Sequence, residues 1–514
     1  MALAQADVVR ALSSPASWQG RPVSRIETHT AYVFLVGERA WKLKRAVRYP
    51  YLDFSTPELR RQMSEAEVRL NCRTAPGLYR GVVAVTESAD GHLEVGGAGV
   101  AIDWLVEMER FPQEALLDAL ASRDCLSLPL MEELAEAIAR FHAGAESVRS
   151  QGGRLGMAWV IDDNADEGFG GLKDVLDQQV MLAVTSKARN ALARVGDVLD
   201  ARRAAGWVLR CHGDLHLGNI VLLDEHPVLF DGIEFNETLA TIDVLYDLAF
   251  LLMDLWRRQL PHHANLLWNA YLGHIGDLSG LGAMPLFLSC RAAIRAKISA
   301  TTALLANDGP DRASHVGQAD AFLRLAEALL APVPPMLLAV GGYSGAGKST
   351  AARAVAPHLG IAPGALVLRS DEIRKRLRGV SPTTRLTTEA YTPEENRRVY
   401  HALGEMAAAV LRQGYTVVVD ASFLSSAERQ AIQDVAAKER VPFMGAWLDA
   451  PVDVLLSRVR TRAHDASDAD ERVVCQQLRT PPRDVAWARI DTTIPIDGVE
   501  RQLVAGLARI GESR

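Results

Sequence analysis

The stretch GGYSGAGKST, residues 341–350, decides the fold of the C-terminal part of the chain. It satisfies every fixed position of the phosphate-binding Walker A motif, G-x-x-x-x-G-K-[ST], from Gly342 to Ser349. A predicted strand, MLLAVGG (336–342), precedes the motif and a predicted helix follows it, which is the context that a P-loop requires. The glycines let backbone N–H groups converge on phosphate oxygens, and the start of the helix adds partial positive charge.

This loop predicts a site for Mg²⁺ and ATP. We expect Lys348 to reach the β- and γ-phosphates and the Ser349 hydroxyl to ligate Mg²⁺. The other predicted nucleotide contacts come from the same loop: Gly342, Ser344, Gly345, Ala346, Gly347 and Thr350.

Further apolar runs at 365–369, 415–420 and 443–449 alternate with helical patterns. This alternation predicts a P-loop α/β domain with a mostly parallel sheet over residues 336–514. Asp371 follows the second predicted strand, where a carboxylate is placed to orient or deprotonate an attacking hydroxyl; a helix cap is the alternative. Asp420 ends the third predicted strand, where it is placed to hold Mg²⁺ or its water.

Basic residues add a second feature to this domain. Arg458 and Arg462 lie four residues apart, on one face of a predicted helix, and are candidates for neutralising a transferring phosphoryl group. A solvated basic face is the alternative. The basic run at 374–378 either lines an acceptor site or faces solvent. The segment 464–474 is predicted to be a mobile loop that closes over the site.

A second chemical motif lies in HGDLHLGN, residues 212–219, followed twelve residues after Asn219 by Asp231. The spacing H-x-D-x-x-x-x-N, then a strand, then D-G, is typical of a kinase catalytic loop and its metal-binding aspartate. Asp214 is therefore predicted to accept the proton of an acceptor hydroxyl, and Asn219 and Asp231 to ligate Mg²⁺. His212 is expected to brace the loop by hydrogen bonding.

The upstream parts of such a site are present in the expected order. Lys42 and Lys44 alternate on one face of a predicted strand, and Lys44 is favoured for the phosphates because Trp41 and Leu43 flank it. The next helix offers Glu65 or Glu67 as the ion-pair partner. Glu107 and Met108, at the end of a predicted strand, are expected to form the hinge that binds adenine.

The chain thus divides into a bilobal protein-kinase-like fold followed by a P-loop domain. Residues 1–110 are predicted to be a β-rich lobe with one helix at 57–71, and residues 111–331 a helical lobe that carries the catalytic loop. Three prolines within 332–335 predict a stiff linker before the P-loop domain, 336–514.

Composition narrows the class of protein. The chain has 514 residues, a net charge of −7 and five scattered cysteines without CxxC spacing, which disfavours a disulfide scaffold or zinc finger. The charge is uneven, with −10 over residues 1–335 and +3 over 336–514. The His262-His263 pair is interpreted as a surface or packing feature, because no motif has metal-ligand spacing. The sequence predicts a cytoplasmic protein without a membrane-spanning segment.

The C-terminal motifs resemble a known group. GGYSGAGKST, RSDEIRKRL, VVVDASF and LLSRVRTR are similar to segments of small P-loop kinases, a group that includes gluconate kinase-like, zeta-toxin-like and polynucleotide-kinase-like proteins. The N-terminal segments HGDLHLGNI, FDGIEF and DLAFLL resemble the aminoglycoside phosphotransferase-like branch of the kinase fold, which commonly lacks a glycine-rich loop. Their fusion resembles a bacterial two-module family, and this resemblance does not establish an aminoglycoside substrate.

These observations predict two ATP-using phosphotransferase modules that transfer the γ-phosphoryl group to hydroxyl acceptors. The acceptors are small molecules or, at the C-terminal module, a nucleotide or nucleic-acid end. The alternative is a nucleotide-sensing regulatory protein in which one module is a switch or a pseudokinase. The sequence identifies neither acceptor and does not indicate the oligomeric state.

Overall fold

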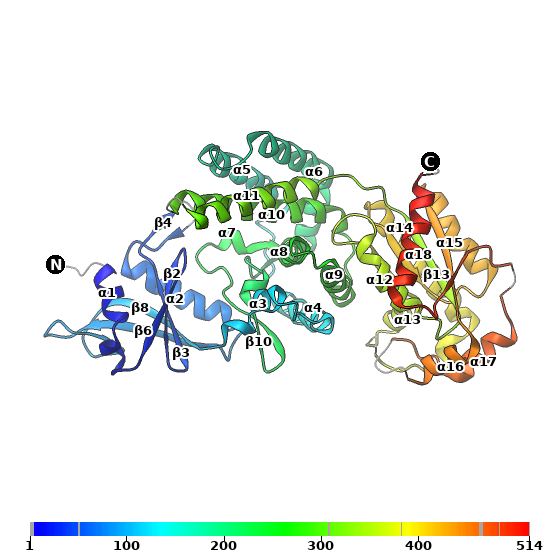
Figure 1. The fold of residues 1–514 in the computed structure, drawn as a ribbon, viewed down its shortest axis with the longest axis horizontal. Helices are drawn as coiled ribbons and strands as arrows, with labels where there is room; N and C mark the ends of the chain where they lie inside the picture. The colour runs from blue at the N-terminus through cyan, green and yellow to red at the C-terminus, as the bar shows by residue number, and fades with distance from the viewer. Residues whose placement is uncertain are drawn as a thin grey trace. The chain divides into compact units, whose positions relative to one another are not determined.

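The computed structural model describes residues 5–49, 52–306, 309–381, 383–461, 466–482 and 484–512. The chain forms two compact units, Met1–Val160 with Gly196–Asp254, and Ile161–Val195 with Leu255–Arg514. Figure 1 shows the elements of both. Among the helices of the described residues, none combines the length and apolar character needed to cross a bilayer.

The first unit begins with a six-stranded antiparallel sheet, order β1-β2-β3-β8-β6-β7. Its strands are β1 (Val23–Glu27), β2 (Ala31–Val36), β3 (Arg39–Lys44), β6 (Tyr79–Glu87), β7 (Leu93–Val95) and β8 (Val100–Glu109). One face buries Trp18, Phe34, Leu43, Val85 and Leu105. This sheet confirms the predicted β-rich lobe of a kinase-like fold.

Helix α2 (Pro57–Asn71) crosses this sheet and has the predicted bounds. Thr56 caps it by accepting the N–H of Leu59 at 3.3 Å, and Pro57 fits the first turn because that position needs no N–H. Arg60 forms a buried two-bond ion pair with Asp103 of β8, each bond 2.8 Å. This pair fixes the rotation of the helix, and so determines which of its glutamates faces β3.

The rest of the first unit places the catalytic loop. This part contains three helices, α3 (Leu117–Ser122), α4 (Leu128–Ala143) and α8 (Val244–Arg257). The hairpin β10 (Ile220–Leu223) and β11 (His226–Leu229) separates the loop at 212–219 from Asp231. The short pair β9 (Val208–Arg210) and β12 (Thr241–Asp243) leads into the loop.

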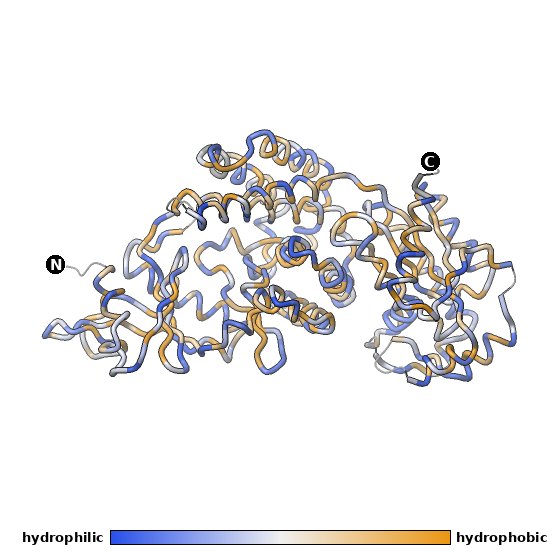
Figure 2. Tube along the Cα trace, in the orientation of Figure 1, coloured by the Kyte–Doolittle hydropathy of each residue, from blue (hydrophilic) through white to orange (hydrophobic). Residues whose placement is uncertain are grey.

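The second unit contains a five-stranded parallel sheet, order β14-β15-β13-β16-β17. The strands are β13 (Leu337–Gly342), β14 (Leu366–Arg369), β15 (Val417–Asp420), β16 (Phe443–Asp449) and β17 (Ala488–Asp491). All six residues of β13 are buried, because helices cover both faces of a parallel sheet. In Figure 2 hydrophobic residues, in orange, are concentrated along these strands. The sheet confirms the predicted P-loop domain.

The helices that belong to this sheet are α12 (Lys348–Val355), α13 (Ser370–Leu377), α14 (Pro393–Arg412), α15 (Ser426–Glu439), α16 (Val452–Arg460), α17 (Glu471–Arg479) and α18 (Ile496–Glu512). The second unit also includes α9 (Pro261–Ile275), α10 (Met284–Leu305) and α11 (Pro310–Ala328), which the sequence assigned to the helical lobe. The proline segment 332–335 lies between α11 and β13, and its role as a domain boundary stays a prediction.

Helix α9 is joined to the P-loop domain by buried amide hydrogen bonds. Asn265 Nδ2 donates to the carbonyl oxygens of Pro363 and Ala365, both at 3.0 Å. One turn later, Asn269 Oδ1 accepts the N–H of Val367 on β14 at 2.8 Å. β14 is an edge strand, so α9 occupies backbone groups that the sheet leaves unpaired.

Candidate active sites

The P-loop joins β13 to α12 as the sequence predicts. Gly342 has a φ of 145°, and a Cβ there would lie 2.6 Å from the carbonyl oxygen of Leu448, so the position requires glycine. Gly345 and Gly347 also have positive φ, 83° and 84°. The loop borders a cavity of 1090 Å³, whose lining includes Ser344, Gly345, Gly347, Lys348, Ser349 and Thr350.

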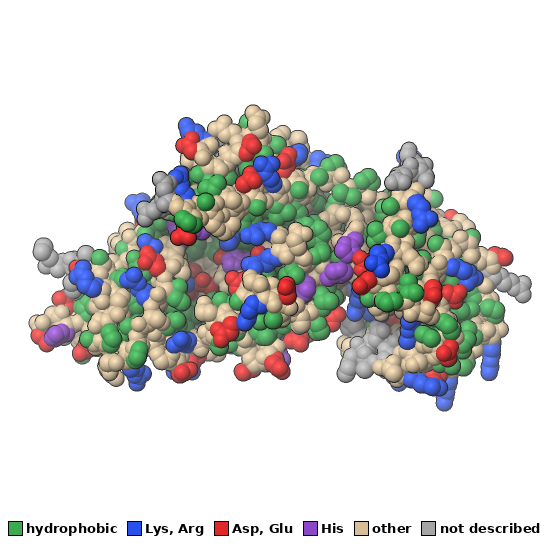
Figure 3. All heavy atoms as spheres, in the orientation of Figure 1, with side chains coloured by type: hydrophobic (Ala, Val, Ile, Leu, Met, Phe, Trp, Pro, Cys, Tyr) green, Lys and Arg blue, Asp and Glu red, His purple; other side chains and the backbone are tan. Residues whose placement is uncertain are grey.

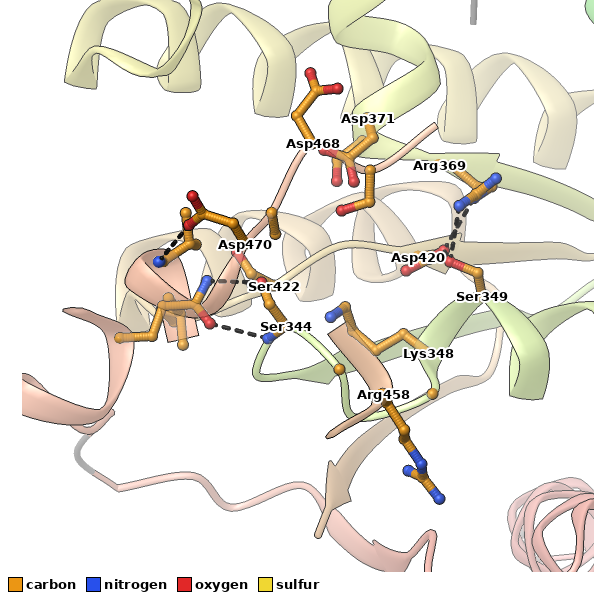
Figure 4. A pocket seen from close by; sticks show the side chains of 18 of the residues that line it. Ser344, Lys348, Ser349, Arg369, Asp371, Asp420, Ser422, Arg458, Asp468 and Asp470 are labelled. Atoms are coloured by element: carbon orange, nitrogen blue, oxygen red, sulfur yellow. Dashed lines mark hydrogen bonds and ion pairs between the residues drawn. The ribbon is translucent and has the colours of Figure 1, made fainter. Parts of the chain in front are cut away.

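Lysine, serine and aspartate side chains meet at the floor of this cavity (Figure 4). Lys348 Nζ donates to the carbonyl oxygen of Tyr343 at 2.9 Å, which folds the side chain along its own loop. The Ser349 hydroxyl donates to Asp420 Oδ2 at 2.6 Å. These are oxygen ligands of the kind Mg²⁺ prefers.

Arg369, at the end of β14, is a member of this group that sequence reasoning missed. Its Nη2 donates to Ser349 Oγ at 3.0 Å, and its Nε lies 3.3 Å from Asp420 Oδ2. The guanidinium is buried and thus balances the buried carboxylate of Asp420. Its place directly before Ser370-Asp371 is the only sequence signal that pointed to it.

Asp371 lies on the opposite wall of the cavity, together with Asp468 (Figure 4). Burial raises the pKa of its carboxyl group, the nearby charge of Asp420 adds to the rise, and a hydrogen bond from Ser467 opposes it. A carboxylate with a raised pKa accepts a proton more readily near neutral pH than an ordinary aspartate.

The basic run after Asp371 divides between the cavity and solvent. Arg374 and Lys375 are buried, whereas Arg376 and Arg378 are exposed. The Arg374 guanidinium lies 4.6 Å from the ring centre of Tyr391, and its Nη1 donates to the carbonyl oxygen of Ala390 at 2.7 Å. Arg374 also lines the cavity, which makes it a candidate acceptor-binding residue.

The segment before α17 and α17 itself close one side of the cavity. Asp468 accepts the Tyr391 hydroxyl at 2.6 Å and lies 3.2 Å from Lys375 Nζ. Gln477 holds the P-loop directly: its Oε1 accepts the N–H of Ser344 at 2.9 Å, and its Nε2 lies 3.2 Å from Ser344 Oγ. Gln477 lies three residues beyond the predicted closing segment 464–474, and the sequence did not single it out. Of that segment, 471–474 belong to α17, 464 and 465 lie outside the described residues, and its closing role stays a prediction.

Arg458 lies beside the P-loop, and its side chain points away from Lys348 and Asp420 (Figure 4). Its Nη1 donates to Thr492 Oγ1 at 3.0 Å and its Nη2 to the Thr492 carbonyl oxygen at 2.6 Å. It lines the cavity, and its role toward the phosphoryl group stays a prediction. Arg462, the second predicted arginine, lies outside the described residues.

The second candidate site, in the first unit, is built around two lysines of β3. Lys42 Nζ lies 2.9 Å from Glu67 Oε1 and 2.5 Å from Asp231 Oδ1. Lys44 Nζ lies 2.5 Å from Glu67 Oε2 and also pairs with Glu234. Lys42 is 15% exposed and Lys44 only 2%, so Lys42 is the lysine next to both the glutamate and the predicted metal-binding aspartate.

This arrangement bears on two predicted assignments. Asp231 contacts Lys42, which makes Lys42 the better candidate for the phosphates, and the phosphate-binding role of either lysine stays a prediction. Glu65 does not face the lysines: it is exposed and pairs with Arg61 at 2.9 Å, since the helix turns Glu67 inward instead.

The predicted hinge residues, Glu107 and Met108, lie near the end of a strand as expected, and their adenine-binding role stays a prediction. Both residues lie inside β8, where the sheet pairs them with β3 on one side and β6 on the other. The Glu107 side chain pairs with Arg39 at 3.2 Å, and Met108 is buried in the core. Their backbone groups are thus engaged in the sheet, and the chain leaves the sheet only at Arg110.

Electrostatics keep the lysine cluster charged. Burial alone would raise the pKa of Glu67, but the ammonium groups of Lys42 and Lys44 outweigh it and lower the pKa to about 2. Burial opposes the charged form of Lys42, yet Asp231 and Glu67 raise its pKa well above the usual value. Burial and the neighbouring charge of Glu67 raise the pKa of Glu234.

The predicted catalytic loop has the expected connections. Asn219 Nδ2 donates to both the backbone oxygen and Oδ2 of Asp214, each at 2.9 Å. His212 Nε2 lies 2.9 Å from the carbonyl oxygen of Phe230, and thus links the loop to the segment that carries Asp231. Asp231 has a φ of 60°, a strained conformation of the kind that clusters at functional sites.

Asp247 of α8, which sequence reasoning did not assign a role, anchors this loop. Its buried carboxylate accepts the N–H of Gly213 at 2.8 Å and that of His212 at 3.2 Å. The same carboxylate lies 3.0 Å from His142 Nε2. Asp214 is thereby held on a fixed loop, with its own side chain 38% exposed.

Two family models match the parts of the chain that carry these residues. Residues 90–284 match the phosphotransferase enzyme family, and residues 337–482 match the AAA domain family. Together these matches support phosphoryl transfer of the kinase type.

One curated relative is similar to the chain over most of its length. The chain is 29% identical over 484 residues to the uncharacterized protein Rv2004c of Mycobacterium tuberculosis, covering 91% of this chain and 92% of the relative. A stretch of 123 residues of the chain is 31% identical to adenylyl-sulfate kinase of Myxococcus xanthus, covering 24% of this chain and 62% of that enzyme.

Solved structures that cover part of the chain are also similar to it. A gluconokinase from Sinorhizobium meliloti is 26% identical, with a TM-score of 0.27, and covers 36% of this chain and 97% of its own. The amicoumacin kinase hAmiN is 13% identical, with a TM-score of 0.40, and covers 63% of this chain and 94% of its own.

Proposed function

We propose that the chain is an ATP-dependent phosphotransferase with two Mg–ATP modules, each transferring a γ-phosphoryl group to a hydroxyl acceptor. One observation carries this proposal: each module gathers its own lysine, carboxylates and metal-type oxygen ligands. These are Lys42 with Asp214, Asn219 and Asp231 in one module, and Lys348 with Ser349, Asp371 and Asp420 in the other.

The oxygen donors fit Mg²⁺ in both modules. Ser349 and Asp420 would hold the ion in the P-loop module, and Asn219 with Asp231 in the kinase-like module. When bound, Mg²⁺ neutralises the phosphate oxygens during transfer.

In the P-loop module different groups bind the phosphates, accept the proton and bind the acceptor. The loop N–H groups and Lys348 bind and orient the phosphates. Asp371 accepts the proton of the acceptor hydroxyl at its carboxylate, which burial has made more basic. Arg374, which lines the same cavity, binds the acceptor or orients it.

In the kinase-like module Asp214 takes the acceptor proton. Glu67 orients Lys42 toward the phosphates, and Asp247 keeps the loop of Asp214 in place. Asn219 Nδ2 points at Asp214, so the amide oxygen is the atom left to serve as a metal ligand.

The test is transfer of ³²P from labelled ATP by the full chain, with a panel of hydroxyl compounds and oligonucleotide ends as acceptors. Lys348→Ala and Asp214→Ala should each remove one acceptor-dependent activity by at least about 100-fold, and the double variant both. Lys438→Ala and Asp197→Ala, on exposed surfaces, are the matched controls. The proposal fails if neither active-site variant binds or consumes ATP differently from the parent.

A regulatory role for the P-loop module is the second candidate, and one contact favours it. Gln477 occupies the N–H of Ser344 that a phosphate would use. A sensor would bind ATP at this module without acceptor-dependent turnover. If the parent shows acceptor-dependent ATP turnover that Lys348→Ala abolishes, the P-loop module is an enzyme and the sensor role is excluded.

A further inference from the structure

Two histidines and a glutamate, distant in sequence, converge in the second unit away from the P-loop cavity. They are His262 at the start of α9, His358 in the short helix η5 (Ala356–His358) and Glu500 on α18. His262 Nε2 lies 3.3 Å from His358 Nε2, which lies 3.2 Å from Glu500 Oε1. One ligand atom from each residue falls within 4.8 Å of the other two.

The separations of His358 Nε2 from its two neighbours, 3.3 and 3.2 Å, match those between ligands in a metal tetrahedron. Zn²⁺ binds imidazole nitrogen and carboxylate oxygen at about 2.0–2.2 Å in tetrahedral sites, which sets neighbouring ligand atoms about 3.3–3.6 Å apart. The two imidazole rings are nearly perpendicular, at 73°, with centres 5.0 Å apart, so their Nε2 atoms converge without stacking. Two imidazoles and one carboxylate form a ligand set that suits Zn²⁺.

Two-centre hydrogen bonds do not satisfy all three side chains of the cluster. His358 Nε2 faces both His262 Nε2 and Glu500 Oε1. If it carries a hydrogen, the two neighbours must share that hydrogen, and if it accepts from His262 its lone pair faces the carboxylate. A cation between the three atoms satisfies all of them at once.

The surroundings prepare the ligands for metal binding. Partial burial lowers the pKa of His262, and His358 contributes, which favours the neutral imidazole that binds metal. The amide bonds of Asn265 and Asn269 hold α9 against the P-loop domain one turn beyond His262. In Figure 3 histidine side chains, in purple, gather over α9 on the visible surface.

We propose that His262, His358 and Glu500 bind a Zn²⁺ ion that clamps α9 to the P-loop domain. Three protein ligands leave the fourth position to water, and the His358 side chain is 37% exposed, so the ion reaches the site from solvent. The described residues contain one other group of this kind, His142, Cys211 and Asp247. That group is fully buried, and Asp247 already anchors the catalytic loop, so it carries no such proposal.

The experiment uses the full chain, stripped with chelator and dialysed against Zn²⁺ at neutral pH. The parent should bind one Zn²⁺. In His358→Asn and in Glu500→Gln the dissociation constant for Zn²⁺ should be at least about tenfold higher. His401→Asn is the matched control, because His401 is exposed beside Glu405 at 3.5 Å in the same domain. Zinc content by mass spectrometry and the visible spectrum of bound Co²⁺ are the two readouts.

A third readout separates a clamp from surface adsorption. Zn²⁺ should raise the midpoint of thermal unfolding of the parent and of His401→Asn, but not of His358→Asn. The proposal is overturned if the parent binds no Zn²⁺, or if His358→Asn and Glu500→Gln bind it as tightly as the parent does.

Discussion

At the scale of single residues, Lys42 and Lys44 differ in burial and partners, and their replacements should differ in effect. Lys42→Met should reduce ATP turnover by the kinase-like module at least about 100-fold with little change in stability, because Lys44 still neutralises Glu67. Lys44→Met should lower the free energy of unfolding by about 3–5 kcal/mol, because it removes the ammonium between buried Glu67 and Glu234.

Both lysine variants are best measured in a Lys348→Ala background, so that only the kinase-like module turns over ATP. Urea unfolding and ATP turnover are followed on the same preparations. Equal loss of stability in the two variants, or unchanged turnover in Lys42→Met, would contradict the assignment of Lys42 to the phosphates.

Asp371 supplies a prediction about pH. Its native pKa lies above the ordinary value of 3.8, so the native state holds this proton more tightly than the unfolded chain does. Between the two pKa values stability therefore falls as pH rises, and above them the ionised carboxylate remains destabilising. Asp371→Asn should raise the thermal midpoint at neutral pH while reducing transfer by about 10²–10⁴-fold.

The check is a pair of pH profiles for the parent and for Asp371→Asn. Activity of the parent's P-loop module should fall as pH drops through the raised pKa, because the protonated acid accepts no proton. The difference in thermal midpoint between the parent and Asp371→Asn should become smaller as the pH falls through the same range. The exposed Asp453→Asn serves as a control. A variant less stable than the parent at neutral pH would refute the argument.

Some residues of the candidate sites could be predicted from the sequence and others could not, for a physical reason. Motif spacing located Asp214, Asn219, Asp231, Lys348 and Ser349, because each lies on a loop whose local geometry the motif encodes. Between Lys42 and Lys44 it favoured Lys44 on the flanking residues alone, since a period of two places both lysines on one face of β3. The choice between Glu65 and Glu67 depended on the rotation of α2, which the distant Arg60–Asp103 pair fixes.

At the scale of elements, α17 and the P-loop are coupled through Gln477. We expect a bound phosphate to compete with Gln477 for the Ser344 N–H, and a net hydrogen bond is worth about 0.5–1.5 kcal/mol. Gln477→Ala should therefore tighten Mg–ATP binding at the P-loop by about 2- to 12-fold. Calorimetry in an Asp231→Ala background, with Gln433→Ala on α15 as control, measures this. Weaker binding would show that Gln477 contacts the nucleotide itself.

Prediction of elements succeeded where the local signal was continuous. Helix 57–71 and strand 443–449 have the predicted bounds, because a capped helix and a buried apolar strand are visible in the sequence alone. β1 and β17 were missed, since both are edge strands whose residues are mostly exposed and polar. The segment of α9 was correctly predicted to be helical. Its attachment to the P-loop domain was not predicted, because it depends on Asn265 and Asn269, which belong to no recognisable sequence motif.

At the scale of the whole molecule, a site whose ligands come from distant segments is invisible to spacing rules. His262 was interpreted as a surface feature because its partners lie 96 and 238 positions later in the chain. The same reasoning explains why the central motifs of the two proposed ATP sites could be predicted: the loop at 212–219 and the P-loop at 342–349 are each encoded within a short segment. Charge adds a whole-molecule contrast, −10 before residue 336 and +3 after it.

Two proposed ATP sites in one chain predict a binding stoichiometry. The full chain should bind two equivalents of a non-hydrolysable ATP analogue in the presence of Mg²⁺. Lys348→Ala and Asp231→Ala should each retain one, and the double variant none, because each change removes phosphate or metal contacts from one module only. Equilibrium dialysis with labelled analogue gives these numbers directly, and the exposed Lys438→Ala should keep both sites. A parent that binds one equivalent, lost in only one single variant, would mean that the other module has kept its residues without the ability to bind ATP.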